Sequence, residues 1–372
     1  MTQLKVDTIT DAAGTAAPDL EDGLTVNGSA LSTVNTAEYY SSGTEPSSPK
    51  DGAIWWDTAN DKVMIYVNDE FREIELGAAA ASFAWGGDKG HYLRDTDFAN
   101  TFSISTPANA TSVSITRSFS QTHSTAAGNV TKLVYAGGST HDDCLVVTSA
   151  TSAVASVTSA LTFAHIRYHE SCSNGTYMTI MAGRTYAANP DNQTQYLTID
   201  SFSSATNGGD LTVARTYPAC VGDATYGVCA GGYASATLDT IDYVTVATTT
   251  AASDFGDLTT GHRSFAGADD ATRGLFAGGI QSDMGSYGNT IEYITTATPS
   301  NGTDFGDLTV SRYACRGCSD GTYAVFVVGY AQGFAADTMD YVTIQTTGNA
   351  TDFGDITNNI EQYGQVASGA AS

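Results

Sequence analysis

Apolar and polar residues alternate in short runs along most of this chain, a pattern typical of β-strands rather than helices. The alternation is clearest in residues 263–309, which divide into four pieces. Residues 263–267 are mostly small, 273–279 form an apolar run that ends in Gly-Gly, 289–295 alternate strictly, and 304–309 close the unit. Four short strands within about fifty residues predict one blade of a β-propeller.

The closing piece recurs along the chain. The sequence DFGDLT at 304–309 is repeated at 254–259, with Ile for Leu at 352–357, and in weaker form at 208–212. The spacings between the corresponding glycines are 47, 50 and 48 residues, for Gly209, Gly256, Gly306 and Gly354. A fixed period near fifty residues indicates a repeat architecture built of propeller blades.

The position of the glycine pair predicts the number of blades. It recurs as Gly86-Gly87, Gly137-Gly138, Ala182-Gly183, Gly231-Gly232, Gly278-Gly279 and Val328-Gly329. Six positions predict an all-β, six-bladed propeller.

An arginine and a tyrosine recur with the same period. The arginines are Arg117, Arg167, Arg215, Arg263 and Arg312, and the third-strand tyrosines are Tyr196, Tyr243, Tyr293 and Tyr341. A residue that recurs in nearly every blade belongs to the blade architecture rather than to a ring of anion receptors. We therefore expect the arginines to hydrogen-bond within the fold, with the aspartates of the DFGD sequence as candidate partners.

The two ends of the repeat region complement each other. Residues 361–367 stand where another first strand is expected, but the chain ends before a glycine-pair strand follows. Residues 81–87 form a glycine-pair strand without a first strand before it. The C-terminal strand is therefore predicted to complete the blade begun at residue 81, which removes the exposed sheet edges of an open arc.

The order of these pieces over residues 81–372 resembles the kelch repeat. The sequence departs from that pattern at Phe255, Phe305 and Phe353, where tryptophan is usual, and in the incomplete pairs at Ala182 and Val328. The resemblance implies a kelch-like propeller and no kelch-type biology.

The first 80 residues divide into two parts. Residues 1–38 alternate short β-like pieces with turn residues, and they have too little apolar surface to fold alone, so we expect an attachment or oligomerisation segment ordered by a partner. Residues 39–80 contain three predicted strands, at 53–58, 62–67 and 71–76, which form a small β-meander followed by a linker of small residues.

Charge narrows the possible partners. The chain has 15 Lys and Arg against 40 Asp and Glu, a formal charge of −25, which argues against binding nucleic acid or an anionic membrane. No run approaches eighteen apolar residues, so we expect no membrane insertion. The first residues contain no apolar run typical of a signal peptide, so we expect synthesis in a cytoplasm without general secretory export.

The motifs of common enzymes are missing from the sequence. It has no nucleophile elbow, P-loop, dinucleotide fingerprint, sialidase Asp box or EF-hand loop, so we predict neither an enzyme nor a cofactor. The pair Cys315 and Cys318 lacks further zinc ligands, and the pair His165 and His169 is weak grounds for a metal site. The six cysteines are expected to be buried thiols.

The loops that follow the glycine pairs vary between blades and emerge on one face of a propeller. They carry aromatic side chains among amides, a combination that suits sugar rings, whose CH faces stack while their hydroxyls hydrogen-bond. The alternative is that these aromatics pack their own loops. The candidate ligand-binding residues are Tyr92, Tyr186, Asn192, Tyr233, Tyr287 and Phe334.

The N-terminal region carries a second resemblance. Residues 5–19 and 23–28 resemble the start of tail-fibre and other virion structural proteins of marine bacteriophages, and residues 49–58 with 63–67 resemble a small β-module common in them. The resemblance implies a place in the virion, contacts with other virion proteins through residues 1–38, and a host-surface glycan or protein as ligand. Fibre proteins of this kind are often trimeric, so a homotrimer is a candidate assembly.

Three functions remain open from the sequence. The first is a tail fibre or receptor-binding component whose propeller displays variable loops to the host surface. The second is a purely structural virion component, such as a decoration, collar or baseplate protein, that binds another virion protein. The third, which the sequence favours least, is an enzyme that degrades surface polysaccharide.

Overall fold

The chain forms two compact units, Met1–Ser82 and Phe83–Ser372. The computed structural model describes residues 25–26, 29–30, 39–42, 44, 46–47, 53–57, 62–67, 70–73, 87–93, 98–114, 123–138, 142–149, 151–158, 160–162, 167–184, 190–201, 204–281, 287–331, 334–335, 337–356 and 365–369. Among these residues there is no helix long and apolar enough to cross a membrane.

The first unit contains two small sheets. Strands β1 (Thr25–Val26) and β2 (Ser29–Ala30) form an antiparallel pair. Strands β3 (Tyr39–Ser42), β4 (Ile54–Asp57), β5 (Lys62–Val67) and β6 (Glu70–Glu73) form a sheet in that order. Strands β4 to β6 pair antiparallel, and β3 pairs parallel with β4.

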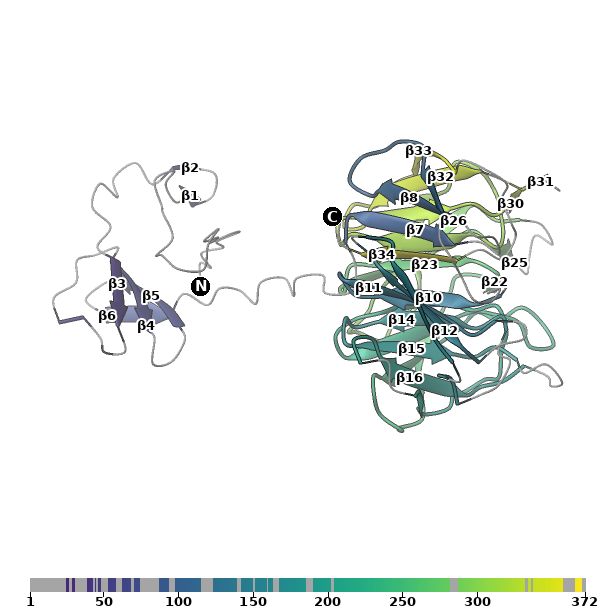
Figure 1. Ribbon diagram of the computed structural model, residues 1–372, viewed down its shortest axis with the longest axis horizontal. Coiled ribbons are helices and arrows are strands. Elements are labelled where there is room, and N and C mark those ends of the chain that lie inside the picture. The colour runs from purple at the N-terminus through teal and green to yellow at the C-terminus, as the bar shows by residue number, and fades with distance from the viewer. Residues whose placement is uncertain are drawn as a thin grey trace. The chain divides into compact units, whose positions relative to one another are not determined.

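The second unit is an all-β, six-bladed propeller (Figure 1). Each blade is a sheet of four antiparallel strands, numbered here from the inside outward. Blade 1 consists of β34 (Gln365–Gly369), β7 (Lys89–Leu93), β8 (Phe98–Ser103) and β9 (Thr111–Ser114); blade 2 of β10 (Thr125–Gly128), β11 (Lys132–Ala136), β12 (Cys144–Thr148) and β13 (Val154–Val157); blade 3 of β14 (Glu170–Ser173), β15 (Tyr177–Met181), β16 (Thr194–Thr198) and β17 (Thr206–Asn207).

The remaining three blades follow the same plan. Blade 4 consists of β18 (Ala219–Gly222), β19 (Tyr226–Ala230), β20 (Thr240–Thr245) and β21 (Ser253–Asp257); blade 5 of β23 (Ala266–Asp269), β24 (Arg273–Ala277), β26 (Thr290–Thr295) and β27 (Thr303–Asp307); blade 6 of β28 (Arg316–Ser319), β29 (Tyr323–Val327), β32 (Thr338–Thr343) and β33 (Thr351–Asp355). Short pairs link β22 (His262–Arg263) with β25 (Ile280–Gln281), and β30 (Tyr330–Ala331) with β31 (Phe334–Ala335).

The innermost strands form a closed ring. They are neighbours in the order β34, β10, β14, β18, β23, β28 and back to β34. The ring is narrow, which explains why these strands are made of small residues. A Cβ atom on Gly267 would lie 2.3 Å from the carbonyl oxygen of Cys220, and one on Gly317 would lie 2.3 Å from the carbonyl oxygen of Gly267. All six cysteines are free thiols and buried, as predicted.

The C-terminal strand closes the ring, but its partner differs from the predicted one. Strand β34 pairs antiparallel with β7 at residues 89–93, with Val366 opposite Tyr92. Strand β7 matches β24 of blade 5 in length and burial pattern. By that alignment Arg94-Asp95 occupies the glycine-pair position of blade 1, so the pair Gly86-Gly87 misled the prediction.

The DFGD sequence forms the outer strand of blades 4, 5 and 6 and joins each blade to the next. Its phenylalanine is buried, and the backbone bulges at the following glycine, as at Gly306 with φ 148°. A Cβ atom there would meet the carbonyl oxygen of Gly348 in blade 6 at 2.4 Å. An asparagine of the next blade accepts the N–H of the last aspartate: Asn301 from Asp257, Asn349 from Asp307, and Asn109 from Asp355.

The Asn109–Asp355 contact shows how the ring seam is made. Asn109 belongs to blade 1 and Asp355 to blade 6, so this hydrogen bond, at 3.0 Å, crosses the point where the two ends of the propeller meet. The N–H of Ala110 also donates to the carbonyl oxygen of Asp355, just as Ala350 donates to Asp307 one blade earlier. The interface between blades 6 and 1 is therefore held by the same two kinds of hydrogen bond as the interface between blades 5 and 6.

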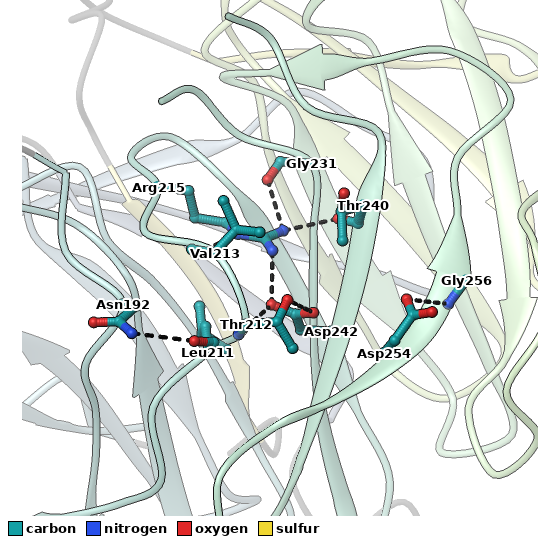
Figure 2. A network of polar contacts seen from close by, with 10 residues as sticks. All are labelled: Asn192, Leu211, Thr212, Val213, Arg215, Gly231, Thr240, Asp242, Asp254 and Gly256. Carbon is teal, nitrogen blue, oxygen red and sulfur yellow. Dashed lines mark hydrogen bonds and ion pairs between the residues drawn. The ribbon is translucent and has the colours of Figure 1, made fainter. Parts of the chain in front are cut away.

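The recurring arginine has a partner other than the predicted one. The guanidinium of Arg215 lies 2.7 Å from Asp242 in strand β20, and both side chains are completely buried (Figure 2). Arg312 pairs in the same way with Asp340 in β32, at 3.1 Å. The partner is thus an acid of the third strand and not an aspartate of the DFGD sequence, which lies in the outer strand.

The same acid also binds the connection between blades. Asp242 accepts hydrogen bonds from the backbone N–H and the hydroxyl of Thr212 (Figure 2). In blade 6, Asp340 accepts the same pair of hydrogen bonds from Thr309. In blade 5 the acid is Glu292, which binds Thr259 and lies 3.3 Å from His262. His262, and not Arg263, therefore occupies the position of Arg215 and Arg312, since each of the three stands three residues after its threonine.

Candidate functional site

The turns before the inner strands share an unusual backbone conformation. In five blades the residue two positions before the inner strand has a positive φ, between 54° and 64°, although none of the five is glycine. These residues are His123, Tyr168, Tyr217, Ser264 and Ala314. Non-glycine residues adopt this conformation rarely and at a cost of about 1–3 kcal/mol, so the surrounding structure must favour it.

Hydrogen bonds between blades provide that support. The N–H of Tyr217 donates to the carbonyl oxygen of Tyr168, that of Ser264 to Tyr217, and that of Ala314 to Ser264, at 2.6 to 2.9 Å. The left-handed turn aims each N–H at the preceding blade. A belt of backbone bonds therefore fixes these turns around the central axis, in blades 3 to 6.

The turns surround a cavity of about 220 Å³ at one end of the central channel. This end, called the mouth here, is where the inner strands begin and the second strands end. Loops that follow the second strands of the antiparallel blades therefore emerge at the same end. The cavity, called the mouth cavity, is lined by residues of blades 2 to 6, including His169, Glu170, Arg263 and Arg316.

Aromatic rings line the mouth. Tyr168 stacks on Tyr217 with ring centroids 4.2 Å apart, and His123 meets the edge of Tyr168 at 4.7 Å. On the other side Tyr313 lies 4.6 Å from Tyr287 and 5.8 Å from Tyr330. These rings come from five blades and are held by one another, so they form a preorganised apolar surface with hydroxyl groups at its edge.

Arginines cover two of the tyrosines. The guanidinium of Arg184 lies 4.9 Å from the ring centre of Tyr168, and that of Arg263 lies 4.6 Å from the ring centre of Tyr233. Cations over aromatic faces are attracted by the ring quadrupole, by about 0.5–1 kcal/mol at exposed sites. The mouth therefore combines aromatic faces with fixed positive charge.

An ion pair forms the floor of the mouth cavity. Arg316 of blade 6 lies 3.5 Å from Glu170 of blade 3, so the pair reaches across the channel between blades on opposite sides of the ring. Both residues also line a second cavity of about 30 Å³. The pair thus separates the two spaces. Burial raises the pKa of Glu170 above its ordinary value, although Arg316 and the hydroxyl of Thr125 act against that rise.

The ring of His169 lies in the cavity wall and is neutral. It is buried, and its Nε2 lies 3.2 Å from the carbonyl oxygen of Ala136, which can only accept. Burial lowers the pKa of His169 to about 4, so the ring is neutral near pH 7 with its proton on Nε2. Its Nδ1 then carries a lone pair, which receives no hydrogen bond from the described residues.

The structure places some of the predicted ligand-binding residues at the mouth and removes one from it. Tyr233 and Tyr287 lie there, in contact with Arg263 and Tyr313. Asn192 donates a hydrogen bond to the carbonyl oxygen of Leu211 and supports its own loop. Phe334 lies in β31, and Tyr186 lies outside the described residues.

The prediction that Tyr92 lies in an exposed loop is wrong. Tyr92 is part of strand β7, and its side chain is completely buried in the core between blades 6 and 1, in a cluster that includes Phe102 and Phe353. The error follows from the misplaced glycine pair of blade 1. A strand residue beside the ring seam was assigned to a loop.

Several residues of the mouth were not among the predicted ones. Tyr168, Tyr217, Tyr313 and Arg316 stand just before or at the start of the inner strands, where the sequence differs in every blade. Tyr168 and Tyr217 have the positive φ angle of these turns, and Tyr313 directly precedes Ala314, which has it in blade 6, but side-chain identity does not record that angle. Their one sequence signal is the distance of four to seven residues after the threonine of a Leu-Thr pair.

Comparison with known proteins adds no identification. No protein-family model matches the sequence, and no curated protein matches it either. Within the described part of the chain, no group of three histidine, cysteine, aspartate or glutamate side chains is placed to hold a metal ion. His165, the proposed neighbour of His169, lies outside that part.

Proposed function

We propose that this chain is a structural protein of a bacteriophage virion, a tail fibre or receptor-binding component, whose propeller binds a host-surface glycan at its mouth. The observation that carries the proposal is the mouth cavity, where stacked tyrosines from several blades surround a space lined by arginine, glutamate and histidine. The virion assignment rests on the resemblance of residues 5–19, 23–28, 49–58 and 63–67 to phage virion proteins.

The chemistry of the mouth suits a sugar. A pyranose ring has an apolar CH face, which stacks on aromatic side chains, and hydroxyls that both donate and accept hydrogen bonds. Tyr217 and Tyr313 offer ring faces, Arg316 offers donors, and Glu170 offers acceptors. The volume of about 220 Å³ is below the roughly 300–1,000 Å³ of pockets for drug-sized ligands, so a single sugar ring is the fitting size.

The proposal includes the finer architecture suggested by the sequence. The propeller is of the kelch-like type, which the glycine pair supports, since Gly231, Gly232, Gly278 and Gly279 all have positive φ angles at the ends of second strands. Residues 1–38 attach the chain to other virion proteins, and residues 39–80 form a small β-module. A homotrimer is the candidate assembly for a fibre.

We propose binding without catalysis at this site. Hydrolysis of a glycosidic bond ordinarily uses two carboxylates that flank the bond. Among the residues that line the mouth cavity in the described part of the chain, Glu170 is the single carboxylate, and it is engaged by Arg316 and Thr125. Its role in the proposal is to fix Arg316 and to accept sugar hydroxyls.

The test is to locate the chain in an electron-microscopy reconstruction of the phage particle. The proposal expects the N-terminal region against the particle and the mouth facing outward, open to solvent. A mouth covered by another virion protein would contradict the receptor role and would favour a purely structural component. Absence of the chain from the particle would contradict the virion assignment itself.

A further inference from the structure

The mouth concentrates positive charge in a strongly acidic protein. The chain carries a formal charge of −25 and only 15 lysines and arginines. Three of these arginines, Arg184, Arg263 and Arg316, lie at or around the mouth cavity, where Glu170 is the single carboxylate among the described lining residues. A neutral sugar does not require such an arrangement.

Two of these arginines retain unused hydrogen-bonding capacity. Arg263 has no carboxylate within ion-pair distance among the described residues, and its Nε–H makes no hydrogen bond there. Arg316 shares its charge with Glu170, donates to the carbonyl oxygen of Cys315, and has an Nε–H without an acceptor in the described part of the chain. A buried donor that lacks an acceptor costs about 1–3 kcal/mol. Both Nε atoms are covered by protein atoms, so a bound anion would be held by the terminal amino groups of the two guanidiniums.

We propose that the mouth cavity recognises a carboxylate-bearing sugar residue, a uronic acid of an acidic surface polysaccharide. This inference rests on the proposed glycan-binding function and names its substrate class. The planar guanidinium groups of Arg263 and Arg316 match a carboxylate in shape and charge. The tyrosine faces take the sugar ring, and Glu170 accepts a hydrogen bond from a sugar hydroxyl.

The acidity of the whole chain is compatible with this ligand. At physiological ionic strength the Debye length is about 8 Å, so exposed charges farther away than that are largely screened. A single carboxylate in the mouth cavity therefore responds to the arginines around it more than to remote surface carboxylates. An extended polyanion lying flat on the protein would still be repelled, which favours recognition of one residue at a chain end or branch.

The experiment is calorimetric titration of the full chain with the methyl glycosides of glucuronic and galacturonic acid. The methyl glycosides of glucose and galactose serve as neutral counterparts, because they differ only in having a hydroxymethyl group in place of the carboxylate. We expect at least one uronide to bind about tenfold or more tightly than its neutral counterpart. Equal or tighter binding of the neutral sugar, or no binding of either uronide, overturns the inference.

Variants connect the effect to the mouth. Arg263→Gln is expected to weaken uronide binding about tenfold and to leave binding of the neutral sugar unchanged. Arg263→Lys keeps the charge but loses the planar fork, so its effect is expected to be intermediate. Arg273→Gln is the matched control, because Arg273 also lies over a tyrosine, Tyr293, at 4.3 Å, but at the opposite end of blade 5. Equal losses in both glutamine variants contradict the assignment.

A separate measurement distinguishes this inference from the proposed function. The full chain is applied to an array of bacterial surface glycans. Binding to neutral glycans only would leave the glycan-binding function standing and overturn the uronic acid assignment. Binding to no glycan would overturn both.

Discussion

At the scale of residues, one buried acid in the third strand joins successive blades. Asp242 binds Thr212 of the preceding connection and the guanidinium of Arg215, and Asp340 does the same with Thr309 and Arg312 in blade 6. In blade 5, Glu292 binds Thr259 and the imidazole of His262. All these side chains except the threonines are buried. Removing one partner of a buried ion pair leaves an uncompensated charge, which costs more than the pair itself contributes.

Arg215→Met is therefore expected to lower the free energy of unfolding by about 3–5 kcal/mol. The double variant Arg215→Met with Asp242→Leu is expected to recover part of that loss, because no charge then stays buried alone. Denaturant unfolding followed by tryptophan and tyrosine fluorescence provides the measurement. Arg263→Met is the control, with an expected loss below about 1 kcal/mol. Equal losses in the two single variants would argue against the ion pair as the cause.

Two buried histidines predict a loss of stability in weak acid. Burial lowers the pKa of His91 and of His169 to about 4 in the folded chain, whereas an unfolded histidine titrates near 6.5. Below about pH 6.5 the unfolded chain therefore binds more protons than the folded chain, and stability falls as the pH falls toward 4. The expected loss is about 2 kcal/mol for each histidine between pH 6.5 and 5.

The variant His169→Gln tests this dependence. Glutamine keeps a donor for the carbonyl oxygen of Ala136 but does not titrate. Melting temperatures are measured from pH 7 to pH 5, and the variant is expected to lose clearly less stability over that range than the unmodified chain. The titration of Glu292 does not account for a loss of stability between pH 7 and pH 5. Burial raises its pKa, but hydrogen bonds from His262 and Thr259 outweigh burial and keep the pKa low, so its stabilising contribution is lost only at more acidic pH. Parallel curves would contradict the role of His169.

The residue scale also shows where sequence reasoning misjudged a side chain. Arg263 was grouped with Arg215 and Arg312 because it is an arginine at nearly the right spacing, but His262 occupies their position. Histidine can substitute because Glu292 is one methylene longer than Asp242 and reaches the shorter base. The equivalent position is identified by its distance from Thr259. A search for a recurring arginine does not detect that distance.

At the scale of elements, the glycine pair ends the second strand of a blade with a left-handed turn. Gly278 and Gly279 have φ angles of 71° and 95°, and Ala182 and Val328 adopt φ angles of 63° and 51° at the first position of the pair in blades 3 and 6. In these two blades a residue with a side chain adopts, at the cost of strain, the left-handed conformation that glycine adopts without strain. The incomplete pairs therefore keep the same turn.

Reciprocal substitutions at equivalent positions test this interpretation. Gly278→Ala is expected to destabilise the propeller by about 1–3 kcal/mol, since its Cβ atom would lie 2.8 Å from the carbonyl oxygen of Arg312. Ala182→Gly is expected to raise stability by up to about 1 kcal/mol, because release of strain exceeds the added chain entropy. Both are measured as shifts of the denaturation midpoint. Destabilisation by both substitutions would contradict the shared turn.

The strands themselves were largely predictable, and the exceptions have physical causes. Blades 4 to 6 follow the repeated pieces closely, because the buried Phe255, Phe305 and Phe353 and the bulged glycines require specific residues. Blade 1 lacks those residues. Its second strand was therefore aligned on Gly86-Gly87, several residues before β7, and Tyr92 was assigned to a loop.

At the scale of the whole molecule, the propeller is held closed by a single C-terminal strand. Strand β34 hydrogen-bonds to β7 in blade 1 and is a neighbour of β10 and β28 in the inner ring. Without it, β7 would be the exposed edge of blade 1, available for pairing with other chains. The sequence indicated this closure, because the pieces at its two ends are complementary.

Truncation tests the closure. Deletion of residues 365–372 is expected to lower the melting temperature by at least about 10 °C and to cause aggregation at concentrations where the full chain is monodisperse, as seen by light scattering. Deletion of residues 370–372 retains β34 and is expected to leave both properties unchanged. A propeller that tolerates the longer deletion as well as the shorter one would contradict closure by this strand.

The residues of the candidate site come together only when the ring of blades is closed. The face of the variable loops was predicted, and Tyr233 and Tyr287 do lie at the mouth. The cavity itself combines His169, Glu170, Tyr217 and Arg316 from blades 3, 4 and 6. These residues meet because six inner strands converge on one axis, and no local pattern in the sequence expresses that convergence.

Glycan binding at the mouth is tested most directly by comparing three forms of the full chain on an array of bacterial surface glycans. Tyr217→Asn removes a ring from the mouth while keeping a residue that tolerates the positive φ of 58°. Tyr177→Asn removes a ring that contacts Tyr196 at the opposite end of blade 3. The account predicts glycan binding by the unmodified chain and by Tyr177→Asn, and at least tenfold weaker binding by Tyr217→Asn. Absence of glycan binding, or equal binding by all three forms, would contradict it.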